Sequence, residues 1–197
     1  MIKTGIFGGA FNPPHKGHIN LAKEAIEQLK LRKLLIIPTF ESPHKATKLA
    51  PFDERAEMCR RAFSGISDKC EVEICEIERE LGGISYTINT LRALKKRCDD
   101  ARFFLLIGGD MLFSFTEWYK YESILKECEV CAAARGGDNF SEMLEYATEV
   151  GRIKVLPTNV VDISSTEIRD KIKNGEDTSE WITEDVRGYI EEKGLYR

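Results

Sequence analysis

The sequence alternates short apolar runs with longer stretches of helical periodicity, and this alternation leaves few folds open to the chain. In residues 17–30, for example, Ile19, Ala22, Ile26 and Leu29 recur at the helical period and so lie on one face. Successive parallel strands need a crossover helix between them, so this alternation is typical of a parallel sheet covered by helices on both faces. We therefore expect an α/β fold with a doubly wound parallel sheet.

The same pattern predicts where the elements lie. Strands are predicted at residues 3–7, 33–37, 70–75, 102–107, 130–134 and 152–156. Helices are predicted between them at residues 17–30, 53–63, 87–97, 122–127 and 139–149. Two further helices, residues 164–173 and 183–193, are predicted to close the chain as a C-terminal helical segment.

Length and composition indicate one globular domain over residues 1–197, because the chain has no repeat, low-complexity segment or Pro/Ser-rich linker. With 29 Lys and Arg against 33 Asp and Glu, the weakly acidic balance argues against a nucleic-acid partner. No apolar run approaches the ~20 residues of a membrane span, and the first residues lack the features of a signal peptide. We therefore expect a cytoplasmic protein with no membrane partner.

The six cysteines fit a reducing compartment, because a chain of this length can build its core without disulfides. Cys128 and Cys131 form the only close pair, and no second pair or nearby His completes a zinc set. We therefore expect structural, buried cysteines.

The loop after the first strand carries the strongest signal for a ligand. Gly8 and Gly9 allow a sharp turn and a close approach of the backbone to a ligand, and the following helix start favours phosphate. His15 and His18 stand about one turn apart on one face of that helix start, where both can donate hydrogen bonds to a polyphosphate. The alternatives are two histidines that cap the helix and face water, or half of a zinc site. We favour the anion site.

Two other segments carry weaker signals. Lys45 adds positive charge to the loop after the second strand, although by itself this segment is only a turn with a basic tip. Ser164 or Ser165 is a natural N-cap, with Glu167 placed for a capping box. Arg169, one turn into that helix, is either an anion ligand or an ordinary surface arginine.

Three residues near later strands have an ordinary structural interpretation, and for two of them contact with a ligand is the alternative. Asp110 follows Gly108 and Gly109 at a strand end, as a helix cap or as a ligand contact. Arg135 follows the fifth strand and either flanks a nucleotide or belongs to a turn. Trp118 lies in an aromatic cluster that core packing alone would explain.

Taken together, these segments resemble the HxGH nucleotidyltransferase superfamily, and within it the bacterial nicotinate mononucleotide adenylyltransferases. The resemblance rests on His-Lys-Gly-His at residues 15–18 and on Ser-Ser-Thr-Glu-Ile-Arg at residues 164–169. Residues 42–45, 85–91, 107–110 and 117–119 support it in the family's order. The resemblance implies a Rossmann-like fold and adenylyl transfer from ATP to nicotinate mononucleotide, which gives deamido-NAD and pyrophosphate in NAD biosynthesis.

The resemblance also implies roles for single residues. His15, His18 and Arg169 would be catalytic and bind the ATP phosphates. Further ATP-binding residues would be Gly8, Gly9, Ala10, Gly108, Asp110, Ser165 and Thr166. The site for the mononucleotide would be formed by Lys45, Tyr86, Thr87, Trp118 and Arg135, with Trp118 stacking on the pyridine ring. Mg²⁺ would be held mainly by the ATP phosphates and water, so no protein metal ligand is expected.

Elementary chemistry agrees with this reaction. The attacking phosphate oxygen is already anionic at neutral pH, so alignment in line with the α-phosphorus and neutralisation of charge suffice, without a general base. The chain departs from the family pattern at Ala10, where Thr or Ser is usual, and at Asn12 and Asn89, where Asp is usual.

Several alternatives stay open. Nicotinamide mononucleotide differs from the acid by one small group, and the sequence does not show the donors that would discriminate the two. Phosphopantetheine adenylyltransferases share both terminal motifs but are typically shorter, and a cytidylyltransferase would differ in the Ser-Ser-Thr segment. A non-catalytic nucleotide sensor on the same fold is the alternative from another class. The net charge of -4 argues against a fragment of a class I aminoacyl-tRNA synthetase, and a homo-oligomer stays open.

Overall fold

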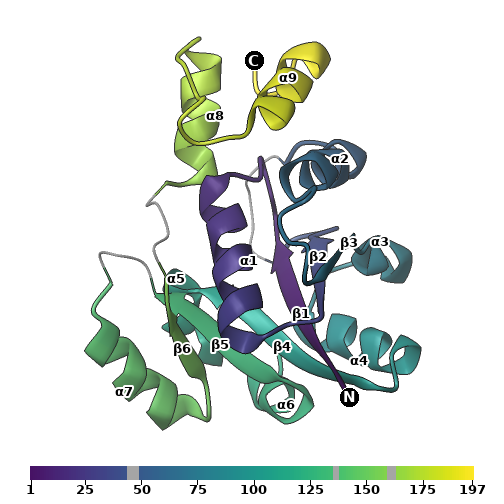
Figure 1. Ribbon diagram of the computed structural model, residues 1–197, viewed down its shortest axis with the longest axis vertical. Coiled ribbons are helices and arrows are strands. Elements are labelled where there is room, and N and C mark those ends of the chain that lie inside the picture. The colour runs from purple at the N-terminus through teal and green to yellow at the C-terminus, as the bar shows by residue number, and fades with distance from the viewer. Residues whose placement is uncertain (44–48, 135–137, 159–162) are drawn as a thin grey trace.

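The computed structural model describes residues 1–43, 49–134, 138–158 and 163–197. Its centre is a six-stranded parallel sheet with the strand order β3-β2-β1-β4-β5-β6 (Figure 1). Because the order runs outward from β1 on one side and from β4 on the other, the sheet is doubly wound, which confirms the expected fold. The strands are β1 (Ile2–Gly9), β2 (Lys33–Pro38), β3 (Glu71–Ile74), β4 (Ala101–Gly108), β5 (Glu129–Ala134) and β6 (Lys154–Pro157).

The central strands are buried on both faces, which explains why they read as continuous apolar runs. Successive side chains of a strand point to opposite faces. Phe7 and Leu106 therefore join one core, whereas their neighbours Ile6 and Ile107 join the other. The sheet thus separates two hydrophobic cores.

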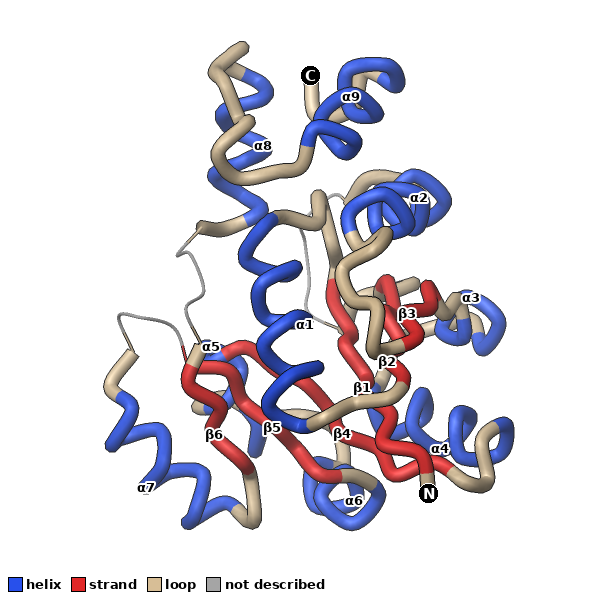
Figure 2. Tube along the Cα trace, in the orientation of Figure 1, coloured by secondary structure: helices blue, strands red, loops and turns tan. Residues whose placement is uncertain are grey.

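Helices cover both faces of the sheet (Figure 2). One core lies under α1 (Lys16–Leu29), α2 (Phe52–Ala62), α8 (Ser165–Lys173) and α9 (Glu184–Lys193). The other core lies under α3 (Ile77–Leu81), α4 (Thr87–Arg97), α5 (Gly109–Leu112), α6 (Tyr121–Glu127) and α7 (Phe140–Val150), with the 3-10 helix η1 (Phe115–Glu117). In the part of the chain that the structure describes, none of these helices has the length and apolar character of a membrane span.

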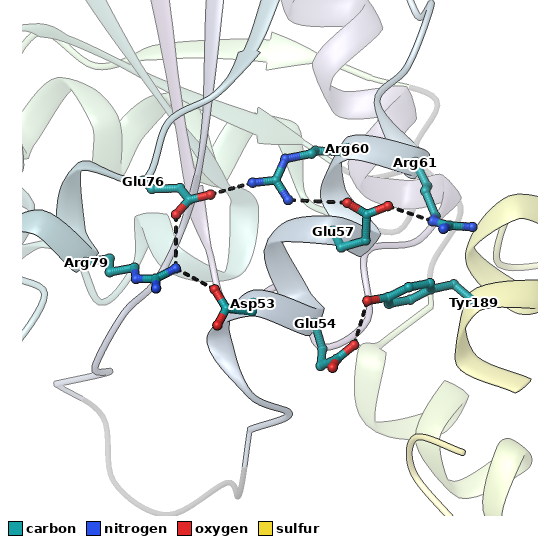
Figure 3. A network of polar contacts seen from close by, with 8 residues as sticks. All are labelled: Asp53, Glu54, Glu57, Arg60, Arg61, Glu76, Arg79 and Tyr189. Atoms are coloured by element: carbon teal, nitrogen blue, oxygen red, sulfur yellow. Dashed lines mark hydrogen bonds and ion pairs between the residues drawn. The ribbon is translucent and has the colours of Figure 1, made fainter. Parts of the chain in front are cut away.

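The C-terminal helices α8 and α9 lie beyond the end of β1, close to the start of α1 (Figure 1). Ile168 and Val186 are completely buried against the core of α1 and α2. Tyr189 of α9 donates a hydrogen bond to Glu54 of α2 at 2.6 Å. Figure 3 shows this bond beside a chain of ion pairs that joins α2 to α3 through Asp53, Glu57, Arg60, Arg61, Glu76 and Arg79. The C-terminal segment is therefore held to α2 by apolar and polar contacts.

The strands and helices predicted from the sequence are present, with boundaries moved by a few residues. The pattern missed α3, α5 and η1, which have five residues or fewer and are too short to show a helical period. Cys131 is buried and Cys128 is half-buried, and burial raises the pKa of both thiols to about 12. Both therefore stay protonated and unreactive at neutral pH.

Candidate active site

The candidate site lies at the carboxyl edge of the sheet, where the strand order reverses between β1 and β4. Ligands of doubly wound sheets bind at this position. β1 ends at Gly9, and residues 10–15 lead from there to α1. Gly8 is exposed, and a Cβ added to it would meet nothing nearer than the Ile37 carbonyl oxygen at 4.0 Å. The backbone at Gly8 therefore presents an open surface to a ligand.

Phe11 forms the floor of this loop. Its ring is buried, and its backbone takes the left-handed conformation with φ of 45°. A Cβ added to Gly9 would lie 3.2 Å from the Phe11 ring, so the glycine makes room for that ring. Phe11 in turn packs edge-on against His18, with ring centroids 5.1 Å apart. Gly9 is therefore needed so that the Phe11 ring can pack against His18.

The two histidines lie together at the start of α1. His15 occupies the N-cap position and is only 8% exposed, so the alternative of a water-facing His15 is wrong. The two imidazole rings have centroids 3.7 Å apart, and the backbone N–H of His15 donates to Nδ1 of His18 at 3.2 Å. A neutral imidazole that accepts at Nδ1 carries its proton on Nε2. His18 can therefore donate from Nε2 to an anion.

The motif at residues 164–169 meets the same loop from the other end of the chain. Ser165 Oγ donates to the carbonyl oxygen of Pro13 at 2.9 Å, and Arg169 Nη1 donates to that of Asn12 at 2.9 Å. Arg169 Nη2 also donates to Thr166 Oγ1 at 3.1 Å. A guanidinium has five N–H donors, so these two bonds leave Arg169 able to bind an anion as well.

The sequence leaves open whether Ser164 or Ser165 is the N-cap of α8, and the hydrogen bonds decide between them. Ser164 is the N-cap of α8, and its Oγ accepts from the Glu167 backbone N–H at 3.2 Å. Glu167 completes the capping box by accepting from the Ser164 backbone N–H at 2.9 Å. The Ser164 hydroxyl also donates to Glu167 Oε2 at 2.7 Å. This bond and the one from the Ser164 backbone N–H hold the pKa of the Glu167 carboxyl below its usual range. Ser164 caps the helix, and Ser165 is thereby left to contact the first loop.

The next strand places Gly108 and Asp110 at the same edge. β4 is paired with β1, and Gly108 is the last residue of β4 and the N-cap of α5. Asp110 is exposed in the first turn of α5. A Cβ on Gly109 would lie 2.5 Å from Asp138 Oδ2 and 3.1 Å from the Ala133 carbonyl oxygen. Gly109 thus allows α5 to pack against β5.

Of the residues expected to bind the mononucleotide, Tyr86, Thr87 and Trp118 lie on the opposite side of the sheet. Tyr86 is the N-cap of α4 and Thr87 is its first residue, and the Tyr86 ring contacts Tyr119 with centroids 4.6 Å apart. Trp118 is half-buried and packs on Phe115 with centroids 5.4 Å apart. The structure therefore brings the segments around Tyr86 and Trp118 together. Lys45 and Arg135 lie outside the described residues.

Two buried polar residues shape the site: sequence reasoning missed Arg55 and treated Asn12 only as a departure from the family pattern. Arg55 is 1% exposed, and its guanidinium donates to the carbonyl oxygens of Ala10 and Ala50, both at 2.9 Å. Burial lowers the pKa of Arg55 below its ordinary value. Asn12 is equally buried and is described below. The burial of Arg55 could have been predicted from the sequence, because the helical period places it on the same face as the apolar residues Cys59 and Ala62.

Comparisons with known proteins agree with this geometry. A family model described as Cytidylyltransferase-like matches residues 6–171. The chain is 36% identical over 195 residues to a protein of Exiguobacterium sibiricum named "Probable nicotinate-nucleotide adenylyltransferase", covering 99% of both chains. It is also 36% identical over 202 residues to a protein of Clostridium acetobutylicum with the same name, covering both chains completely.

A solved structure shows the same fold at low identity. The Plasmodium falciparum nicotinic acid mononucleotide adenylyltransferase complexed with NaAD superposes with a TM-score of 0.82 at 18% identity. The match covers 100% of this chain and 98% of that one. Since the family model spans most of the chain and the relatives match along its whole length, the chain belongs to the cytidylyltransferase-like family, among the nicotinate-nucleotide adenylyltransferases.

Proposed function

We propose that the chain transfers the adenylyl group of ATP to nicotinate mononucleotide, forming deamido-NAD and releasing pyrophosphate. The observation that carries the proposal is the contact between the first loop and the motif at residues 164–169, through the bond from Ser165 to the carbonyl of Pro13, 152 positions away. That contact sets Arg169 and the start of α8 beside the loop that leads to His15 and His18. Imidazole, guanidinium and helix N-termini are all donors suited to a polyphosphate.

The reaction needs little from the protein beyond position and charge. An oxygen of the mononucleotide phosphate attacks the α-phosphorus of ATP, and the bond from that phosphorus to the bridging oxygen breaks. The electron pair leaves with pyrophosphate, so no proton has to be removed from the nucleophile. His15, His18 and Arg169 would hold the triphosphate in line and neutralise the charge that develops on the leaving group.

The two substrates would enter from opposite sides of the edge. ATP would lie over Gly8, Gly9 and Ala10, with further contacts from Gly108, Asp110, Ser165 and Thr166. The mononucleotide would lie near Tyr86 and Thr87, with Trp118 stacking on its ring and with Lys45 and Arg135 as further ligands.

The donors at this edge are imidazoles and a guanidinium, which bind phosphate better than they bind Mg²⁺. We therefore expect Mg²⁺ to enter with ATP, coordinated by its phosphate oxygens and by water. The metal would neutralise phosphate charge. We further propose that the reaction takes place in the cytoplasm, where ATP is available.

The decisive measurement is pyrophosphate release from ATP and Mg²⁺ with three acceptors in parallel: nicotinate mononucleotide, nicotinamide mononucleotide and phosphopantetheine. Rapid release with nicotinate mononucleotide alone supports the proposal. Equal rates with both pyridine nucleotides would support adenylyl transfer but contradict a preference for nicotinate over nicotinamide mononucleotide. ATP binding without release from any acceptor would favour a nucleotide sensor.

A further inference from the structure

Beneath the first loop lies a buried amide that joins three distant segments of the chain. Asn12 is 2% exposed. Its Oδ1 accepts from the backbone N–H of Ala50 at 3.0 Å and from the Tyr196 hydroxyl at 2.9 Å. Its own carbonyl oxygen accepts from Arg169 Nη1 at 2.9 Å. One residue thus links the first loop to residue 50, to α8 and to the tail that follows α9.

The direction of these hydrogen bonds is determined by the donors. A backbone N–H can only donate, so the Asn12 atom that faces Ala50 must be the amide oxygen. The same oxygen faces Tyr196, so the tyrosine hydroxyl must be the donor. Burial raises the pKa of Tyr196 above its ordinary value, which keeps the hydroxyl protonated. Within the described residues the other amide atom, Nδ2, is buried without a hydrogen-bond partner.

The tail is shaped to bring Tyr196 to this point. α9 ends at Gly194 in the left-handed conformation, and Leu195 N–H donates back to the Ile190 carbonyl at 3.0 Å. Tyr196 itself has φ of 65°, which is uncommon for a residue with a Cβ and persists only where surrounding contacts hold it. Such backbone conformations concentrate at functional sites. The tail is therefore held in one conformation by specific contacts.

The helix before the tail is anchored to the core. Tyr189 of α9 donates to Glu54 of α2, and the Arg61 guanidinium lies 4.4 Å from the centroid of the Tyr189 ring (Figure 3). From α2, Arg55 also reaches the loop by donating to the Ala10 carbonyl. The tail and α2 thus hold the two sides of the same loop.

The loop depends on such outside donors because of its composition. Pro13 and Pro14 have no backbone N–H, so the segment just before His15 cannot fix itself with hydrogen bonds of that kind. Instead, Arg55, Arg169 and Ser165 donate to its carbonyl oxygens, and Tyr196 donates to the side chain of Asn12. A small displacement of this segment moves His15, and with it the alignment of the reacting phosphates.

We propose that Tyr196 is a positioning residue for adenylyl transfer, acting through Asn12 to hold the loop that places His15 and His18 against the ATP phosphates. This inference rests on the proposed function. It adds the tail after α9, which carries none of the family motifs considered above, to the residues that determine the rate.

The test compares Tyr196→Phe with Tyr189→Phe. Each change removes one phenolic hydroxyl that the C-terminal segment donates to the rest of the protein. We expect Tyr196→Phe to lower kcat for pyrophosphate release about three- to tenfold, with little change in KM for nicotinate mononucleotide, because one hydrogen bond that aligns the reacting groups is lost. Tyr189→Phe should leave kcat unchanged, because Val186 and Ile190 of α9 stay buried in the core without that hydroxyl and Tyr189 donates to α2 rather than to the first loop. An unchanged kcat in Tyr196→Phe would overturn the proposal. It would also be overturned if kcat fell equally in both variants and in proportion to the fall in their melting temperatures.

A double-mutant cycle with Asn12→Ala tests the route of the effect. If Tyr196 acts through Asn12, adding Tyr196→Phe to the Asn12→Ala variant should lower kcat no further. Additive losses would contradict the route. Should Asn12→Ala not fold, Asn12→Asp keeps both acceptor contacts, and the penalty of Tyr196→Phe should then grow, because a charged acceptor strengthens the bond. If Tyr196→Phe lowers kcat in Asn12→Asp by the same factor as in the unaltered protein, the effect does not pass through Asn12.

Equilibrium binding of ATP by calorimetry separates this proposal from the proposed function. If the unaltered protein releases no pyrophosphate with any acceptor, the proposed function fails. The positioning role then predicts that Tyr196→Phe weakens ATP binding about threefold or more while Tyr189→Phe does not. Equal ATP affinity in the two variants would overturn the positioning role alone.

Discussion

His15 occupies the N-cap position of α1 and also lies at the proposed phosphate site, so one residue serves both the helix and the reaction. These two roles can be separated, because Asn is a favoured N-cap residue but has no imidazole. His18 Nδ1 accepts from the backbone N–H of residue 15, a hydrogen bond that a substitution of the His15 side chain leaves available.

We expect His15→Asn to lower kcat by about 10²–10³-fold while the melting temperature stays nearly constant, because one preorganised donor to developing charge is lost. His15→Ala should show the same kinetic loss and also lose helix stability of about 1 kcal/mol. Pyrophosphate release and thermal unfolding of both variants check this. Activity in His15→Asn close to that of the unaltered protein would rule out a catalytic role for the imidazole.

Glu78 is a second residue for which the structure predicts an effect, here on how stability depends on pH. It is 9% exposed and accepts hydrogen bonds from Thr90 Oγ1 at 3.0 Å and from the Phe40 backbone N–H at 3.3 Å. Burial raises the pKa of its carboxyl, and hydrogen bonds from Ser85, Thr90 and Phe40 and the charge of Arg55 oppose that rise only in part. The folded protein therefore binds a proton at Glu78 more tightly than the unfolded chain does.

This difference in proton binding makes the stability of the protein depend on pH. The stabilisation from the bound proton is fully present below the ordinary pKa of 4.5 and is lost as pH rises through the raised value. Glu78→Gln cannot titrate, so the free energy of unfolding should fall less between pH 4.5 and 7 in this variant. Glu80→Gln is the control, because hydrogen bonding to Arg97 lowers the pKa of Glu80 and its effect has the opposite sign. Identical slopes in urea titrations of Glu78→Gln and the unaltered protein would contradict the prediction.

At the scale of elements, α8 shows how a helix start can be shared between stability and binding. Ser164 caps the helix, which leaves Ser165 and Arg169 directed at the first loop. The cap therefore fixes the first turn of α8, which carries Ser165 and Arg169 as proposed phosphate ligands.

We expect Ser164→Ala to lower the free energy of unfolding by about 1 kcal/mol, because the N-cap acceptor is removed. It should also weaken ATP binding, because the first turn of α8 frays. Ser64→Ala is a matched control, since Ser64 is an exposed hydroxyl in the turn after α2. Urea unfolding and calorimetry measure the two effects. A loss of stability with ATP affinity unchanged would show that the cap serves the fold alone.

For the whole molecule, the site joins parts of the chain that lie far apart in sequence. α8 and α9 contribute to the same core as α1 and α2, and their polar contacts reach the first loop. A ligand that binds both the loop and α8 should therefore stabilise the fold as a unit.

At a free concentration of 100 times its Kd, ATP should add about 2.7 kcal/mol to the free energy of unfolding, which corresponds to a rise in Tm of about 5–10 °C. Arg169→Ala should lose most of this rise at the same ATP concentration. Thermal unfolding with and without ATP measures it. A rise of equal size in Arg169→Ala would exclude the guanidinium from the ATP site.

Much of the fold was predictable from the sequence, because the strand and helix patterns are local and repeat within one element. The six strands and the longer helices carried such a pattern, whereas α3, α5 and η1 were too short to carry one. The first loop and residues 164–169 were recognisable because glycines, histidines and caps stand at fixed offsets. The roles of the site residues and the single domain over residues 1–197 stay predictions.

The sequence by itself determined the order and type of the main elements and made the two motifs of the candidate site recognisable, because hydrophobic periodicity and cap chemistry act between near neighbours. Only the tertiary structure decided what holds the first loop. The contacts from Arg55 to Ala10, from Arg169 to Asn12 and from Tyr196 to Asn12 join residues 45, 157 and 184 positions apart. Such contacts follow from how the chain packs around the sheet. Periodicity can indicate that a residue such as Arg55 is buried, but no local pattern indicates which distant residue it contacts.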